Sequence, residues 1–180
     1  MSLWGNSDAD EAKPKWLTAA QKKLTFADAR GWVYKQSDNH QEEVLCAIGE
    51  LATSIGQADI TDITWVTTAF DKSDGGTLSV TARFNEAVDV TGTPQLTVVN
   101  DQRTNHTLSY ASGTGTNELV FTLAIPAANA ATNADDVLSI GANAMALNGG
   151  TVKDAGTTTV SAITNSAAIG TAAGTITVVA

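Results

Sequence analysis

The stretch Thr77-Leu78-Ser79-Val80-Thr81-Ala82-Arg83-Phe84 decides the fold class, because apolar and polar side chains alternate strictly along it. A period of two places one face in a core and the other in water, as in an antiparallel sheet. Residues 118–123 repeat the pattern, with Leu119, Phe121 and Leu123 on one face. The two stretches predict strands of a β-rich domain.

Further candidate strands lie on both sides of these stretches, with turn residues between them. We expect strands at 63–69, 95–99, 107–111, 137–140, 158–163 and 174–179. Short stretches rich in Gly, Asn, Asp and Pro, which are typical of turns, lie at 72–76, 91–94, 112–115, 148–150 and 154–156. This number of short strands, separated by turns at regular intervals, predicts an immunoglobulin-like antiparallel β-sandwich. Lys and Pro, the usual protectors of edge strands, are scarce, which indicates that neighbours cover some edges.

Charge divides the chain near residue 60. Residues 1–60 contain 6 Lys/Arg and 9 Asp/Glu (15 of 60), whereas residues 61–180 contain 4 and 10 (14 of 120). We therefore expect an N-terminal docking segment over 1–60 and the β-sandwich domain over 61–180. Residues 1–15 are expected to form an extended arm.

Two short helices are predicted within residues 1–60. Thr18-Ala19-Ala20-Gln21 is typical of a capping box, with an exit at Asp28-Ala29-Arg30-Gly31. A second helix is expected over 39–56, with an apolar stripe formed by Val44, Leu45, Ile48, Leu51, Ala52 and Ile55. Trp32-Val33-Tyr34 favours a short strand instead. Helices this short need the sandwich or another protein to pack against.

Composition narrows the classes of partner. The formal charge of −9 argues against nucleic acid as a partner, because an acidic protein repels the phosphates. It favours a partner with a basic surface. No apolar run is long enough to span a membrane, and the N-terminus has no features of a secretory signal. The single cysteine, Cys46, cannot form an internal disulfide, which suits a reducing cytoplasm.

Residues 62–156 resemble the immunoglobulin-like modules of bacterial and phage proteins. The resemblance lies in Gly76–Leu96, Tyr110–Phe121 and Ile140–Ala155, and the chain departs from the module's usual end after residue 156. Such modules occur in surface-layer, adhesin and virion proteins. The resemblance therefore identifies the fold more specifically than it identifies the function.

A second resemblance concerns the first 55 residues. Ser2-Leu3-Trp4-Gly5-Asn6, Lys13-Pro14-Lys15-Trp16-Leu17-Thr18, Arg30-Gly31-Trp32-Val33 and Glu43-Val44-Leu45-Cys46-Ala47-Ile48 are similar to short virion proteins of contractile-tailed phages of marine cyanobacteria. This resemblance implies assembly in the host cytoplasm, location in the virion, and capsid or tail subunits, or neighbouring copies, as partners.

The aromatic and basic side chains of the first part are the candidate partner-binding residues: Trp4, Lys13, Lys15, Trp16, Trp32 and Tyr34. Trp anchors many interfaces, and Lys adds charge-assisted contacts. Alternatively, Trp16 and Trp32 fill the bottom of the sandwich, and both interpretations remain open for these two rings. A partner contact is favoured for Trp4. Trp65, in the first β-strand, is expected in or near the core.

Catalytic, metal and cofactor sites are not expected. His40 and His106 are the only histidines, and each is interpreted as a polar surface residue; Cys46 is interpreted as a buried structural thiol. No phosphate-binding loop or nucleophile elbow is present. The loop acids Asp71, Asp74, Asp135 and Asp136 could bind Ca²⁺, but their spacing matches no calcium loop and favours solvated turn residues.

These observations favour a non-enzymatic, capsid-associated decoration or cement protein that docks through its N-terminal segment and displays the β-sandwich. A tail, neck or baseplate component is the alternative. A glycan-binding adhesive module would require exposed aromatic residues on the β domain, where Tyr110 is the only Tyr.

Overall fold

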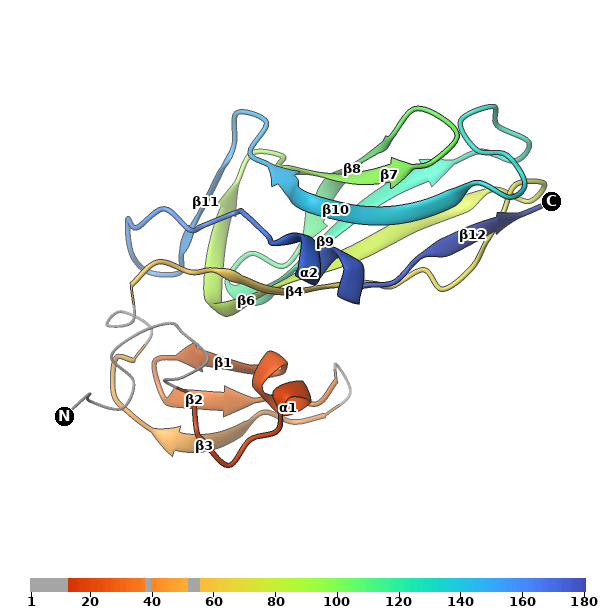
Figure 1. Cartoon of the computed structure of the whole chain (residues 1–180). Helices are drawn as coiled ribbons and strands as arrows, with labels where there is room; N and C mark the ends of the chain where they lie inside the picture. The colour runs from red at the N-terminus through yellow and green to blue at the C-terminus, as the bar shows by residue number, and fades with distance from the viewer. Residues whose placement is uncertain (1–12, 38–39, 52–55) are drawn as a thin grey trace.

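The computed structural model describes residues 13–37, 40–51 and 56–180 and is mainly β (Figure 1). The strands form one large open mixed sheet in the order β3-β2-β1-β6-β9-β8-β7-β10-β12-β5, and β4 and β11 also pair with β6. We call residues 13–51 the N-terminal unit and residues 56–180 the β domain. The predicted β-rich class is thus confirmed.

The N-terminal unit begins with the single-turn helix α1 (Ala19–Lys23). The predicted capping box is confirmed: Gln21 N–H donates to Thr18 Oγ1 at 3.2 Å, and Thr18 N–H donates to Gln21 Oε1 at 3.0 Å. Strands β1 (Thr25–Asp28), β2 (Gly31–Tyr34) and β3 (Glu43–Ala47) follow as an antiparallel meander. The predicted strand at Trp32-Val33-Tyr34 is therefore also confirmed.

The predicted second helix is wrong. Its first apolar residues belong to β3, which pairs with β2 through Trp32↔Cys46 and Val33↔Val44. Sheet pairing with β2 outweighs the helical spacing of these side chains, because propensity is a weak prior against tertiary context. Asn39, Ala52 and Ile55 lie outside the described residues.

Gly31 starts β2 rather than ending a helix. Its φ is +125°, and a Cβ there would lie 2.1 Å from the Cys46 carbonyl oxygen. Only glycine permits the two strands to approach this closely.

The β domain contains the two stretches with strict alternation. Its strands are β4 (Ile60–Trp65), β5 (Phe70–Asp71), β6 (Gly76–Thr91), β7 (Gln95–Asn100), β8 (His106–Ser112), β9 (Thr116–Ile125), β10 (Val137–Ala146), β11 (Thr151–Asp154) and β12 (Ile176–Val179). β6 and β9 pair through Leu78↔Leu123 and Ala82↔Leu119. Figure 1 shows β7, β8 and β10 above β4 and β6. The predicted inward face of β6 is fully buried: Leu78, Val80, Ala82 and Phe84.

The C-terminal segment differs from the prediction. Residues 158–163 form only isolated bridges, Asp59↔Ala162 and Lys153↔Val160, and are followed by the helix α2 (Ala167–Ala172), which was not expected. Ser166 Oγ accepts from Ile169 N–H and caps this helix. The expected strand at 174–179 is confirmed as β12. Residues 160–162 pair with Ala58 and Asp59, just before β4, and with the outer edge of β11.

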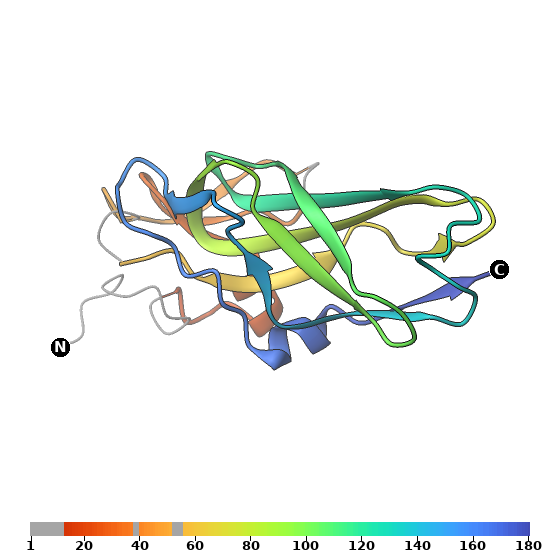
Figure 2. The same ribbon diagram turned by 90° about the horizontal axis from the view of Figure 1, so that it is seen from above.

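The two parts of the chain meet at a bend in β6. The β6–β9 ladder shifts register between Arg83 and Val88, and β1 joins β6 there through the parallel pair Ala27↔Glu86. Lys23 Nζ lies 3.2 Å from Asp62 Oδ1 across the same junction. Figures 1 and 2 both place the N-terminal unit alongside the half of the β domain that lies away from the C-terminus.

Candidate docking surface

Trp16 is the most exposed large apolar side chain of the described residues, with 63 % of its surface accessible. It lies between Pro14, which is buried, and α1, none of whose residues is buried. Lys15 beside it is exposed as well. A largely exposed indole next to a helical turn without buried residues has the composition of an interface anchor.

Trp32 and Lys13 do not belong to this surface, which corrects the predicted partner-binding set. Trp32 is 0 % exposed and packs with Ala27 and Leu51 in the small core of the N-terminal unit. Lys13 is 1 % exposed, and its Nζ donates to the Lys22 carbonyl oxygen at 2.7 Å, at the C-terminal end of α1. Both side chains stabilise the N-terminal unit. The Trp32 ring fills its small core, and the Lys13 ammonium binds the negative C-terminal end of α1.

The remaining predicted residues have mixed positions. Tyr34 is half-buried on β2, opposite Glu43 of β3. Trp4 lies outside the described residues. The structure therefore leaves Lys15 and Trp16 as the exposed pair of the predicted set, with Tyr34 at intermediate exposure.

An ion cluster joins the β1–β2 turn to the start of β3. Arg30 donates to Asp28 Oδ2 through Nε at 2.8 Å, and its Nη2 also binds Glu42. The hydrogen bonds that Arg30 donates, first to Asp28 and then to Glu42, raise the pKa of Arg30 above its ordinary value. The cluster lies in solvent, so its function is to orient the turn rather than to supply much stability.

A cleft of about 310 Å³ separates the N-terminal unit from the β domain. Phe26, Asp28, Lys35 and Glu42 line one wall, and Ala87 with residues 115–118 lines the other. Glu118 is held by Arg83, whose Nη2 lies 2.6 Å from Glu118 Oε1. Both acidic and basic side chains line the cleft, which lies at the junction of the two parts.

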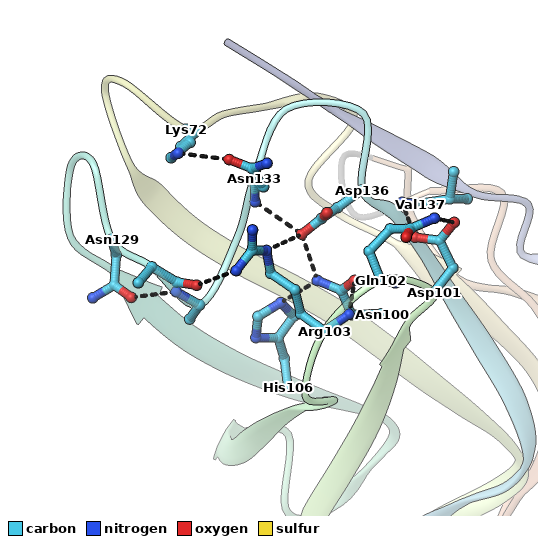
Figure 3. A network of polar contacts seen from close by, with 12 residues as sticks. Lys72, Asn100, Asp101, Gln102, Arg103, His106, Asn129, Asn133, Asp136 and Val137 are labelled. Carbon is cyan, nitrogen blue, oxygen red and sulfur yellow. Dashed lines mark hydrogen bonds and ion pairs between the residues drawn. The ribbon is translucent and has the colours of Figure 1, made fainter.

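A buried polar network ties the loops together at the opposite end of the β domain (Figure 3). Asp136, 1 % exposed, accepts at Oδ2 from Asn133 N–H at 2.8 Å and from Asn100 Nδ2 at 2.9 Å. Arg103 Nε lies 3.4 Å from the same oxygen. Lys72 Nζ donates to Asn133 Oδ1 at 2.7 Å. The network fixes three loops against one another.

His106 is part of this network, so its expected surface position is wrong. It is 4 % exposed, and its Nε2 lies 3.4 Å from Asn100 Nδ2. Asn100 Oδ1 accepts from Gln102 and Arg103 N–H groups, which turns the amide NH₂ toward His106 and requires an unprotonated Nε2. Burial lowers the pKa of His106, and the charge of Asp136 opposes that effect.

The loop acids are engaged in turns rather than gathered around one point. Asp71 Oδ1 accepts from the Ser73 hydroxyl at 2.6 Å and from its N–H at 2.7 Å, and these bonds lower the pKa of Asp71. Asp135 has a positive φ of 69° and donates its N–H to the Val178 carbonyl oxygen. Within the described ranges, no group of three His, Cys, Asp or Glu side chains could hold a metal ion.

Other side chains with possible chemistry have structural partners. Ser37 Oγ and His40 Nδ1 are 2.7 Å apart on an exposed loop. Tyr110 packs edge-on against Phe121 and accepts from Thr114 N–H, so its ring is not an exposed platform. Trp65 packs against the core, as expected, and its Nε1–H donates to the Gly174 carbonyl oxygen. Cys46 is a free thiol in β3 and is partly exposed, so its expected burial is wrong.

No protein-family model, no curated protein and no solved structure matches this chain. Within the described residues, no helix combines the length and apolar character needed to cross a membrane. Function therefore has to be argued from the surfaces and contacts of this chain itself.

Proposed function

We propose that this chain is a non-enzymatic structural protein of a phage virion. It docks through the N-terminal unit as a capsid-associated decoration or cement protein, and the β domain is displayed outward as an immunoglobulin-like sandwich. The cyanophage resemblance of residues 2–48 supports the virion location, and the resemblance of residues 62–156 supports the immunoglobulin-like domain.

The observation that carries the docking role is the exposure of Trp16. An indole with 63 % of its surface in water gains more than most side chains when a partner covers it, by roughly 25 cal/mol per Å² of apolar area. Lys15 and Lys22 lie in the same segment and offer charge-assisted contacts around the ring. This is the arrangement of an apolar anchor with a polar rim.

The junction of the two parts supports the display role. The Ala27↔Glu86 pair and the Lys23–Asp62 ion pair attach the N-terminal unit directly to β6 and to the start of β4. A docked N-terminal unit would therefore hold the β domain in a defined orientation. The loop network around Asp136 lies beside β12, near the C-terminus and away from the N-terminal unit.

Gold labelling of purified virions with an antibody against the β domain tests this proposal. Label over the head supports a decoration or cement protein. Label confined to the tail, neck or baseplate would replace that role with the alternative one. Virions that contain no trace of the chain by mass spectrometry would overturn the virion assignment.

A further inference from the structure

The outer edge of β3 ends the sheet. Among the described residues, β2 is the only strand hydrogen-bonded to β3, whereas the C-terminal segment covers other edges of the fold. Ala162 N–H donates to the Ala58 carbonyl oxygen before β4, and Ser161 N–H donates to the Val152 carbonyl oxygen of β11. Within residues 13–37, 40–51 and 56–180, the fold thus covers the edges near β4 and β11, while no strand pairs with the outer edge of β3.

This edge has the chemistry that receives another strand. Alternate residues of Glu43–Ala47 direct their N–H and C=O groups away from β2, and such groups are a template for backbone pairing. Val44 is 41 % exposed, and no Lys or Pro interrupts the strand. A bulge at Leu45 between the two paired segments keeps the available edge short. The fitting occupant is a short extended segment.

The charges around β3 restrict that occupant further. Residues 40–50 contain the acids Glu42, Glu43 and Glu50 and no Lys or Arg. Arg30 binds Glu42 from the neighbouring turn, while Glu43 forms no ion pair with any described residue. A second copy would bring the same acids and another charge of −9 to the edge. A basic segment of a different protein complements it.

We propose that β3 binds, by strand addition, an extended segment of another protein that alternates apolar side chains with Lys or Arg. This inference rests on the proposed function, because it names the chemistry of the partner at the docking unit. Backbone pairing with β3 provides the contact, and Val44 and Glu43 select apolar and basic side chains respectively.

The test uses the full chain and a synthetic peptide of about eight residues with alternating valine and lysine, the length of an ordinary strand. Hydrogen exchange is measured at the amides of residues 43–47 with and without peptide. We expect exchange there to slow by about tenfold at saturation, because newly paired amides are protected. A peptide with N-methyl groups on alternate amides, and one with glutamate in place of lysine, should give no protection.

Two variants with the same charge change separate the edge from general electrostatics. Glu43→Lys should weaken binding of the valine–lysine peptide by about fivefold or more, whereas Asp74→Lys, on the exposed β5–β6 turn at the far end of the β domain, should leave it unchanged. Equal losses in both variants, equal binding of the N-methylated peptide, or protection outside β3 would each overturn strand addition. Dimers that protect β3 without peptide would identify a second copy as the occupant and overturn the partner named here.

Failure of this inference is distinguishable from failure of the proposed function. Peptide binding at β3 by a chain absent from virions would refute the virion role and leave the edge assignment standing. A virion-located chain whose β3 gains no protection would refute the strand addition alone.

Discussion

Ala27 of β1 pairs in parallel with Glu86 of β6, at the place where the β6–β9 ladder shifts register. Two parts with different charge densities are thereby joined through backbone pairing and not only through a linker. A carboxylate 1 % exposed, that of Glu86, lies at this seam. The N-terminal unit therefore belongs to the same sheet as the β domain.

Replacing Trp32 with alanine should reduce the stability of the N-terminal unit far more than replacing Trp16 with alanine. Trp32→Ala removes the largest side chain of the small core and should destabilise the N-terminal unit by about 3–5 kcal/mol. Trp16→Ala should have a much smaller effect on its stability, because most of the Trp16 side chain is exposed. Hydrogen exchange of β2 amides measures both. Equal destabilisation by the two variants would contradict the separation of core ring from surface ring.

Gly31 should tolerate no side chain. Gly31→Ala places a methyl group against the Cys46 carbonyl oxygen at a positive φ, and should destabilise the β2–β3 pair by about 1–3 kcal/mol or more. Gly49→Ala is the matched control, since no atom lies within 4 Å of a Cβ there. Exchange rates of the β2 and β3 amides provide the readout. A neutral Gly31→Ala would show that the close strand approach is wrong.

His106 should make the β domain acid-sensitive. Burial lowers its pKa in the folded state, so the unfolded chain binds the proton more readily. Its contribution to stability is present above the ordinary histidine pKa of about 6.5 and is lost as pH falls toward the folded value. Urea unfolding between about pH 5 and pH 7.5 should show this slope, and His106→Gln should flatten it. The same slope in the variant would assign it to other groups.

Asp136 should be the most sensitive carboxylate of the loop network. Asp136→Ala leaves the Asn133 N–H, the Asn100 NH₂ and the Arg103 guanidinium without their shared acceptor, and should lower the free energy of unfolding by about 3 kcal/mol. Asp74→Ala, on an exposed turn, should change it by less than about 0.5 kcal/mol. Urea unfolding at neutral pH measures both variants; a small effect of Asp136→Ala would mean that water replaces the carboxylate.

The sequence predicted the β domain better than the N-terminal unit, for a physical reason. In β6 and β9, strict alternation specifies strand, face and burial together, so Leu78 and Leu119 could be placed in the core at once. In Glu43–Ala47 the apolar residues also fit the spacing of one helix face. Only the pairing with β2 makes this segment a strand. That pairing depends on Gly31, twelve residues before β3, whose role as a close-contact glycine has no local signal.

The partner-binding role of the candidate residues stays a prediction, and the structure shows only which of them are exposed. Lys15 and Trp16 are exposed as the docking hypothesis requires, but exposure depends on packing that composition does not reveal, and Trp32 is therefore buried. The network of Asn100, Asp136 and His106 joins loops that are distant in sequence, so no spacing could have indicated it. The outer edge of β3, which pairs with no described strand, could not be predicted because the sequence of β3 favours a helix.

Cross-linking mass spectrometry of purified virions with an amine-reactive reagent tests the central claim most directly. The account predicts that Lys15 links to another virion protein, whereas Lys72 and Lys153 of the β domain give few or no such links. Links to other virion proteins confined to Lys72 and Lys153, with Lys15 unlinked, would contradict docking through the N-terminal unit.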